Sequence, residues 1–156
     1  MHKVEQSIEI DRPVTTVYNQ WTQFETFPVF MQGVTEVRQV DDTHLHWKAM
    51  LGGKDVEWDA EITEQEPDRR ISWKSTSGAH NAGTVRFKRI GRDRTVVRLV
   101  MAYETHGAYE SLGSAMGAVD ARVRHTLHDF KKFAESQAVE TGAWRGEVVA
   151  GRQLPG

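Results

Sequence analysis

Tyr103, Ser75 and Asp120 are the side chains whose types could handle protons beside an apolar surface. Tyr103 and Ser75 lie in two predicted strands, at positions whose side chains point to the same face as the apolar ones. Asp120 follows Val119 near the apolar stripe of a predicted helix. A phenol, a hydroxyl and a carboxylate in one interior could orient a carbonyl group or act as acid and base in an aldol-type cyclisation. The alternative for Asp120 is an ion pair with Arg124, one helical turn away, and we favour it because helix surfaces carry such pairs routinely.

Two histidine pairs and one acidic row have the residue types of metal ligands. They are His125 with His128 beside Asp129, His44 with His46, and the row Glu57, Asp59 and Glu61. Each histidine pair lacks a clear third ligand, so we interpret both pairs as solvated surface groups. The alternating carboxylates are typical of the wet face of a sheet. The sequence therefore predicts no metal site and no cofactor.

Composition excludes several classes of partner. The 156 residues are 38% hydrophobic and 27% charged, which is typical of a folded domain. A net charge of -2 offers no basic excess for a nucleic acid, and without cysteine there is no disulfide or thiolate site. The polar N-terminus does not resemble a signal peptide, and no stretch has the length of a membrane span. We expect a cytoplasmic protein with no integral membrane association.

Residues 33–103 alternate as strands separated by turn signals. The alternation is clearest over 56–62, where every apolar side chain falls on one face and every carboxylate on the other. Six strands fit between the turns, and even spacing of apolar residues over 3–10 predicts a seventh strand ahead of them. Short strands joined by hairpin-length turns predict an α+β fold with an antiparallel sheet that is dry on one face.

Large apolar side chains gather on this predicted dry face and in a short segment before the sheet. The strands supply Trp47, Trp58, Trp73, Phe87, Met101 and Tyr103, and the earlier segment supplies Phe24, Phe27, Phe30 and Met31. We predict a pocket whose wall includes all of these except Phe24, together with Met116 and Asp120 from the helix. The alternative is an ordinary aromatic core. The early segment forms either a mobile gate or a lid that packs once and stays in place.

The segment from about Tyr109 to about Val139 predicts a helix of about eight turns. Its first half is thin, because glycine, serine and alanine fill much of 113–121, whereas its second half carries the large side chains Phe130 and Phe133. We predict one domain over 1–140. The tail 141–156 is predicted to be flexible, although its tryptophan could dock.

Three stretches of sequence resemble a known family, namely 19–31, 57–65 and 70–75. With the order of elements, they resemble the START-like superfamily SRPBCC, in its bacterial polyketide cyclase/dehydrase or coenzyme Q-binding branch, over residues 3–138. The resemblance implies a helix-grip fold: a seven-stranded curved antiparallel sheet wrapped around a long C-terminal helix, with two short helices after the first strand. It also implies a hydrophobic cavity beneath the sheet. The ligand is left open, because the family spans lipid carriers, hormone receptors and cyclases.

Three functions from different classes follow. The first is non-catalytic binding or transport of a small hydrophobic ligand, such as a lipid, an isoprenoid or a polyketide-like aromatic. The second is a polyketide aromatase/cyclase or dehydratase. Catalytic members of the superfamily usually direct a buried arginine or carboxylate into the cavity, whereas strand parity leaves only Lys54 and Arg89 with inward parity, at strand ends, which disfavours an enzyme. The third is an interaction module with a filled core. The chain is expected to be a monomer or a homodimer.

Overall fold

The computed structural model describes residues 2–51, 53–104, 116–137 and 139–154, with side chains at all of these except 51 and 116–118. A long antiparallel sheet and one long helix make up most of the described chain. In chain order the elements are β1 (His2–Ile10), α1 (Val14–Trp21), the 3-10 helix η1 (Phe24–Val29), β2 (Val34–Asp41), β3 (His44–Leu51), β4 (Lys54–Glu66), β5 (Arg70–Gly78), β6 (Asn81–Gly91), β7 (Arg94–Tyr103), α2 (Met116–Ser136), β8 (Val148–Val149) and β9 (Arg152–Gln153).

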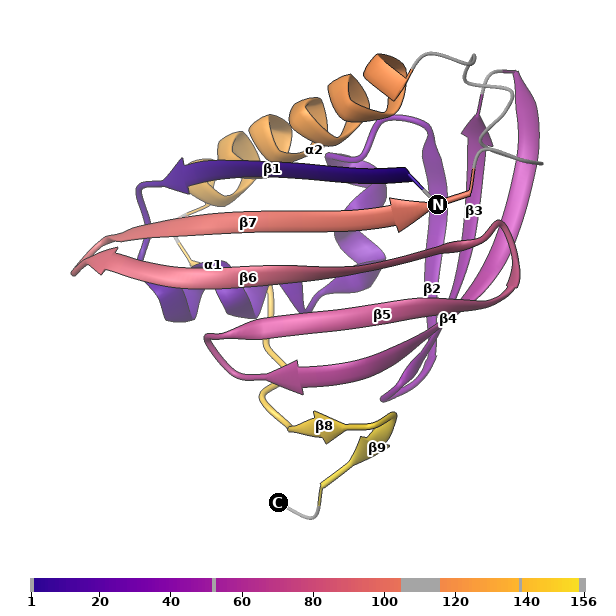
Figure 1. Ribbon diagram of the computed structural model, residues 1–156. Helices are drawn as coiled ribbons and strands as arrows, with labels where there is room; N and C mark the ends of the chain where they lie inside the picture. The colour runs from indigo at the N-terminus through magenta and orange to yellow at the C-terminus, as the bar shows by residue number, and fades with distance from the viewer. Residues whose placement is uncertain (1, 52, 105–115, 138, 155–156) are drawn as a thin grey trace.

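The sheet is a meander from β2 to β7, and β1 joins it beside β7, giving the order β1-β7-β6-β5-β4-β3-β2. All neighbouring strands are antiparallel. Figure 1 shows the sheet curving, so that β2, β3 and β4 turn away from β1 and β7 while α2 crosses the open side. The curvature creates an interior that a flat sheet would lack.

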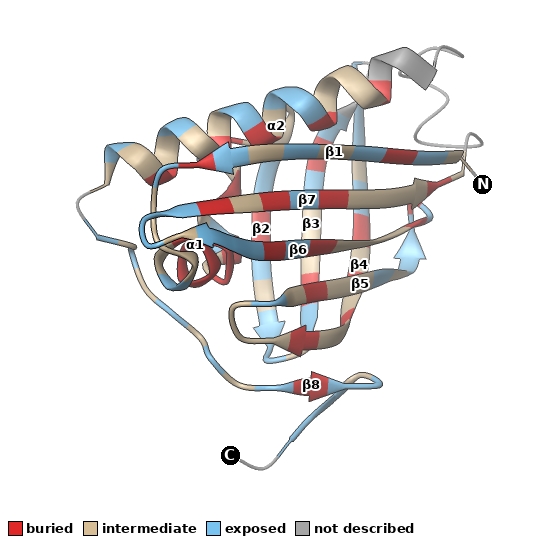
Figure 2. Ribbon diagram, turned by 60° about the vertical axis from the view of Figure 1, so that its left-hand side comes forward, coloured by how far each residue is buried: buried red, intermediate tan, exposed pale blue. Residues whose placement is uncertain are grey.

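Burial follows the predicted alternation along β4. Trp58, Ala60 and Ile62 are buried, whereas Glu57, whose side chain points to the opposite face, is exposed. Buried residues recur along the strands of the sheet and along α2 (Figure 2). Because successive strand residues point to opposite faces, one parity error would have exposed this whole set.

The α+β helix-grip prediction is confirmed, with two short helices after the first strand and a long helix after the sheet. The structure adds β8 and β9, so the sheet has nine strands rather than the predicted seven. The long helix ends at Ser136, a few residues before the predicted Val139. The predicted start near residue 109 lies outside the described residues.

The tail contacts the domain along residues 141–148. The amide N–H of Thr141 donates to Gln20 Oε1 over 2.9 Å, and Gln20 Nε2 donates back to the Thr141 hydroxyl over 3.0 Å. Trp144 packs against the core, as the sequence allowed, and Val148 is fully buried where β8 pairs with β4. Flexibility of the tail stays a prediction.

Among the described residues, no helix has the length and apolar character needed to cross a membrane.

Candidate functional site

A partly open cavity of about 170 Å³ lies between the sheet and α2. Its wall draws on α1, η1, α2 and the strands from β2 to β7. The lining residues are Trp21, Phe24, Phe27, Met31, Gln32, Val34, Leu45, Trp47, Ala49, Trp58, Ala60, Ile62, Ile71, Trp73, Asn81, Leu99, Met101, Val119, Arg122, Val123 and Thr126. Nearly all are apolar, so the cavity suits a hydrophobic molecule better than a polar one.

Trp47 and Trp58 form a flat aromatic wall. They sit opposite each other in the β3–β4 register, and their rings stack at 5.5 Å with an interplanar angle of 10°. Phe27 meets the Trp47 ring at 5.7 Å and joins η1 to this wall. A stacked pair with an open face can accept a further flat group by the same offset stacking.

The third tryptophan of the wall, Trp73, is fixed by one hydrogen bond and one glycine. Its indole Nε1 donates to Asn81 Oδ1 over 2.9 Å. A Cβ on Gly83, which faces Trp73 in the β5–β6 register, would lie 2.6 Å from the indole ring, so only glycine leaves room for this ring position. The hydrogen bond and the missing side chain together hold the indole at the cavity.

Apart from Arg122, the described helix lines the cavity with smaller side chains. Val119, Val123 and Thr126 line it, and they come from the first half of the described helix and its middle. Leu127 and Phe130 follow and are almost fully buried without lining the cavity. Most of the predicted thin stretch, 113–121, has side chains outside the described residues, so its contribution to the space stays a prediction.

Six of the predicted pocket residues line the cavity: Phe27, Met31, Trp47, Trp58, Trp73 and Met101. Phe30 and Phe87 do not, which corrects their predicted placement. Both are buried against Trp21, at ring distances of 6.4 and 6.2 Å, in the filled part of the interior. Met116 begins α2, and its side chain lies outside the described residues.

None of the three candidate proton carriers lines the cavity, which corrects their predicted placement. The Ser75 hydroxyl accepts a hydrogen bond from the backbone N–H of Asn81 over 3.1 Å. Tyr103 is 1% exposed at the end of β7, where burial and then the charge of Asp120 raise its pKa. Asp120 points towards β1 instead and accepts a hydrogen bond from Gln6 Nε2 over 2.7 Å.

The expected pair between Asp120 and Arg124 is present at 3.5 Å, but the closer partner of the carboxylate is Gln6 on β1. Sequence spacing can predict a partner on the same helix. A partner 114 positions away can be identified only from the tertiary structure.

Four polar residues reach the cavity wall that the sequence did not assign to it: Gln32, Asn81, Arg122 and Thr126. Lys54 and Arg89 have inward strand parity, but they lie at strand ends and are exposed. The cation at the cavity wall comes from the helix instead. The available signal was helical spacing, since Arg122 lies three residues after Val119 and beside Val123. Asn81 begins β6 and is 6% exposed.

His44 and His46 have carboxylate neighbours. His46 Nδ1 lies 2.6 Å from Asp59 Oδ1, and this hydrogen bond raises the pKa of His46 despite its partial burial. His44 Nδ1 lies 2.8 Å from Asp41 Oδ1. Within the part of the chain that the structure describes, no three His, Cys, Asp or Glu side chains are grouped to hold a metal ion.

A curved antiparallel sheet closed by a C-terminal helix over an apolar cavity defines a START-like, helix-grip protein. The model of the family described as "Polyketide cyclase / dehydrase and lipid transport" matches residues 10–132. The chain belongs to this family. A relative from Streptomyces lincolnensis, an uncharacterized 17.2 kDa protein in the melC2-rnhH intergenic region, is 48% identical over 150 residues, covering 96% of this chain and 100% of the relative.

Solved structures share the fold at low sequence identity. The Zhui aromatase/cyclase from Streptomyces sp. R1128 has a TM-score of 0.75 at 15% identity, with 92% of this chain and 99% of that chain covered. A START superfamily protein from Mycobacterium smegmatis has a TM-score of 0.72 at 13% identity, with 87% and 99% covered. The matched family is described by polyketide cyclase/dehydrase activity and lipid transport, and the solved structures show the shared fold.

Proposed function

We propose that this protein binds a small hydrophobic molecule, such as a lipid, an isoprenoid or a polyketide-like aromatic, in the cavity beneath its sheet. The observation that carries the proposal is the partly open cavity of about 170 Å³ with a nearly continuous apolar wall. For scale, an apolar cavity of about 150 Å³ is known to hold a benzene molecule. The enclosed space fits one ring or a short acyl segment, and the open side accommodates the rest of a longer ligand.

Burial of the ligand supplies most of the affinity, at about 25 cal/mol per Å² of apolar surface removed from water. The stacked pair Trp47 and Trp58 favours a flat ligand, because aromatic faces pack best with an offset. Asn81 contributes little orientation, since its Oδ1 accepts from Trp73 and its Nδ2 donates to the Ala79 carbonyl.

Polyketide cyclisation or dehydration is the second candidate, supported by the description of the matched family. It is less well supported, because Ser75, Tyr103 and Asp120 are not among the residues that line the cavity. If these residues act as its acid and base, replacing all three should abolish turnover of a polyketide substrate, and unchanged turnover would overturn this candidate. The third candidate, an interaction module with a filled core, requires an interior without the cavity that the described residues enclose.

The test of the proposal combines ligand recovery with a cavity-filling variant. Native mass spectrometry of protein from its own host should find a co-purifying hydrophobic molecule, and the neutral fluorophore Nile red should bind the emptied protein. Ala49→Phe places a ring in the cavity and should weaken Nile red binding. Ala102→Phe is the matched control, because residue 102 has the opposite strand parity to the cavity-lining Met101. Recovery of empty protein that also ignores the fluorophore would overturn the proposal.

A further inference from the structure

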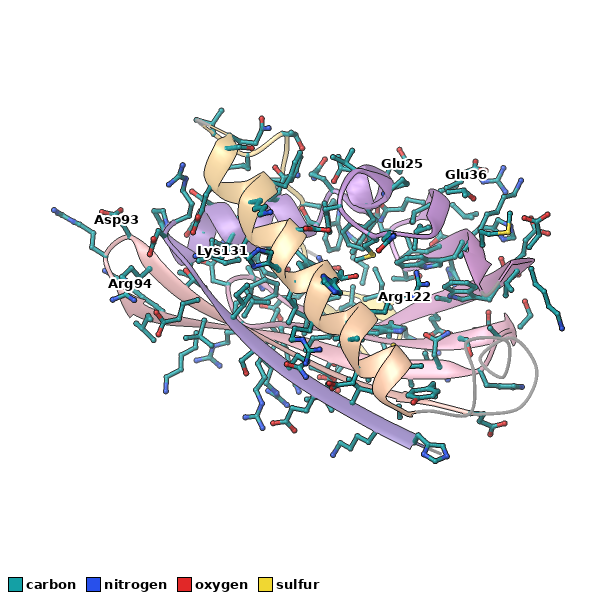
Figure 3. The ribbon with its side chains drawn as sticks, turned by 90° about the horizontal axis from the view of Figure 1, so that it is seen from above. Glu25, Glu36, Asp93, Arg94, Arg122 and Lys131 are labelled. Carbon is teal, nitrogen blue, oxygen red and sulfur yellow. The ribbon has the colours of Figure 1, made fainter. Side chains whose placement is uncertain are left out.

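The cavity wall contains one cationic side chain among the described residues, the guanidinium of Arg122. It leaves α2 towards the start of β2, where its Nη1 donates to the Gln32 carbonyl over 2.6 Å. Figure 3 shows Arg122 on one side of α2 and Lys131 on the other side, facing β1. Arg122 is partly exposed, so the guanidinium stands where the apolar cavity meets the surface.

The local backbone is shaped to receive this side chain. Gly33 follows Gln32 with φ +91°, a conformation that glycine adopts readily and other residues rarely do. A Cβ at this position would lie 2.5 Å from Arg122 Nη1 and 3.0 Å from the Met50 carbonyl oxygen. The close approach of Arg122 to the turn before β2 therefore depends on the absence of a side chain at residue 33.

Among the described residues, the charge of Arg122 has no carboxylate partner. Within the described residues it forms no ion pair within 4 Å, and its one hydrogen bond goes to a neutral carbonyl. The neighbouring Arg124 pairs with Asp120, and Lys131 pairs with Glu135. A guanidinium has five N–H donors in a planar fork that matches a carboxylate. Most of the donor capacity of Arg122 is thus available at the edge of an apolar space.

We propose that Arg122 selects ligands that carry a carboxylate, by pairing with that group at the cavity mouth while the apolar body of the ligand lies against the tryptophans. The inference rests on the proposed binding function and names its ligand class: amphipathic organic acids with an aromatic or acyl body. Thr126, one helical turn after Arg122, lines the same cavity and places a hydroxyl on the same side of the helix.

The experiment measures the affinity of two probes of nearly equal shape, 4-butylbenzoate and neutral 4-butylbenzyl alcohol, by isothermal titration calorimetry at pH 7. Arg122→Gln keeps an amide N–H for the Gln32 carbonyl and removes the charge. It should weaken 4-butylbenzoate binding about tenfold or more, because hydrogen bonds to charged groups contribute more than neutral ones. The affinity for the alcohol should stay within about twofold, since its apolar contacts are unchanged.

Arg124→Gln is the matched control, because this arginine lies two residues further along α2 and does not line the cavity. It should leave both affinities unchanged. Arg122→Lys retains the charge and should recover part of the preference for the acid, which also keeps the test usable if Arg122→Gln does not fold by circular dichroism.

The outcomes separate the two proposals. If wild type and Arg122→Gln bind 4-butylbenzoate equally well and both bind the alcohol, the selection by Arg122 is overturned and the cavity binder stands. If the wild-type protein binds neither probe, both proposals are overturned for ligands of this size. If Arg122→Gln weakens binding of 4-butylbenzoate and leaves binding of the alcohol unchanged, the inference is supported.

Discussion

The two ends of the interior contain similar aromatic residues, yet one end is filled and the other is open. At the filled end, the Phe130 ring lies 4.7 Å from Trp21 and 5.1 Å from Phe30, both at steep interplanar angles. At the open end, Trp47 and Trp58 stack on each other, and the helix presents no aromatic ring to them among its described residues. Aromatic content therefore does not make a cavity. The bulk of the opposite helix decides whether the space between is filled.

The largest expected effect tests the filled end. Phe130→Ala removes a fully buried ring from a close-packed cluster and should lower the free energy of unfolding by about 3–5 kcal/mol. Val123→Ala removes less volume beside an existing cavity and should cost clearly less. Urea denaturation followed by tryptophan fluorescence measures both variants. Equal losses would show that the two ends are packed alike, which contradicts the comparison.

A second test uses the proton equilibrium of Tyr18, which lies 5.3 Å from Phe87 at the filled end. Burial raises the pKa of Tyr18 to about 12, although the nearby Gln65 side chain and the charge of Arg145 lower it. The folded state holds the phenolic proton more tightly than the unfolded state does. The resulting stabilisation is present below pH 10 and is lost as the pH rises towards 12, by about 3 kcal/mol in all.

Tyr18→Phe isolates this effect, because it removes the titrating group and keeps the ring. Between pH 9 and about 11.5, wild type should lose unfolding free energy more steeply than the variant, as measured by urea denaturation at each pH. Parallel curves would mean that the Tyr18 hydroxyl is as accessible to water in the folded state as in the unfolded chain.

A pair of small-to-large substitutions sharpens the comparison further. Ala134→Phe adds a ring to a buried position of α2 that does not line the cavity, and overpacking should cost about 1–3 kcal/mol. Ala49→Phe adds the same ring where the cavity offers room and should cost less than Ala134→Phe. Thermal unfolding compares the two. A larger loss for Ala49→Phe would indicate that the cavity cannot accept a ring at all.

The smallest expected effect on the free energy of unfolding comes from His46, on the solvent-exposed face of the sheet. The hydrogen bond to Asp59 raises the pKa of His46, so its stabilisation is present below the unfolded pKa of about 6.5 and is lost as the pH rises through the folded value. Because both side chains are partly exposed, the contribution is about 0.5 kcal/mol or less. Asp59→Asn should lower the pKa of His46 in an NMR titration. Asp41→Asn, beside His44, should leave the pKa of His46 unchanged.

Much of the site was predictable because strand parity is a local property. Alternation over 56–62 places Trp58 and Ile62 inside, and the register with the neighbouring strands then carries Trp47 and Trp73 to the same wall. The same reasoning placed Tyr103 and Phe87 on the correct face. It also assigned them to the pocket, but neither is among the residues that line the cavity. Parity states which side of the sheet a residue faces, and it says nothing about how far along the interior the cavity extends.

The sequence by itself determined the order of the elements from β1 to α2 and the dry face of the sheet, because these follow from periodicities of two and 3.6 residues. Only the tertiary structure decided which aromatic side chains fill space and which border it. It also decided that Arg122 reaches the cavity while Asp120 turns to Gln6 on β1. Such partners are set by how α2 rotates and crosses the sheet, and that depends on contacts between residues more than 100 positions apart.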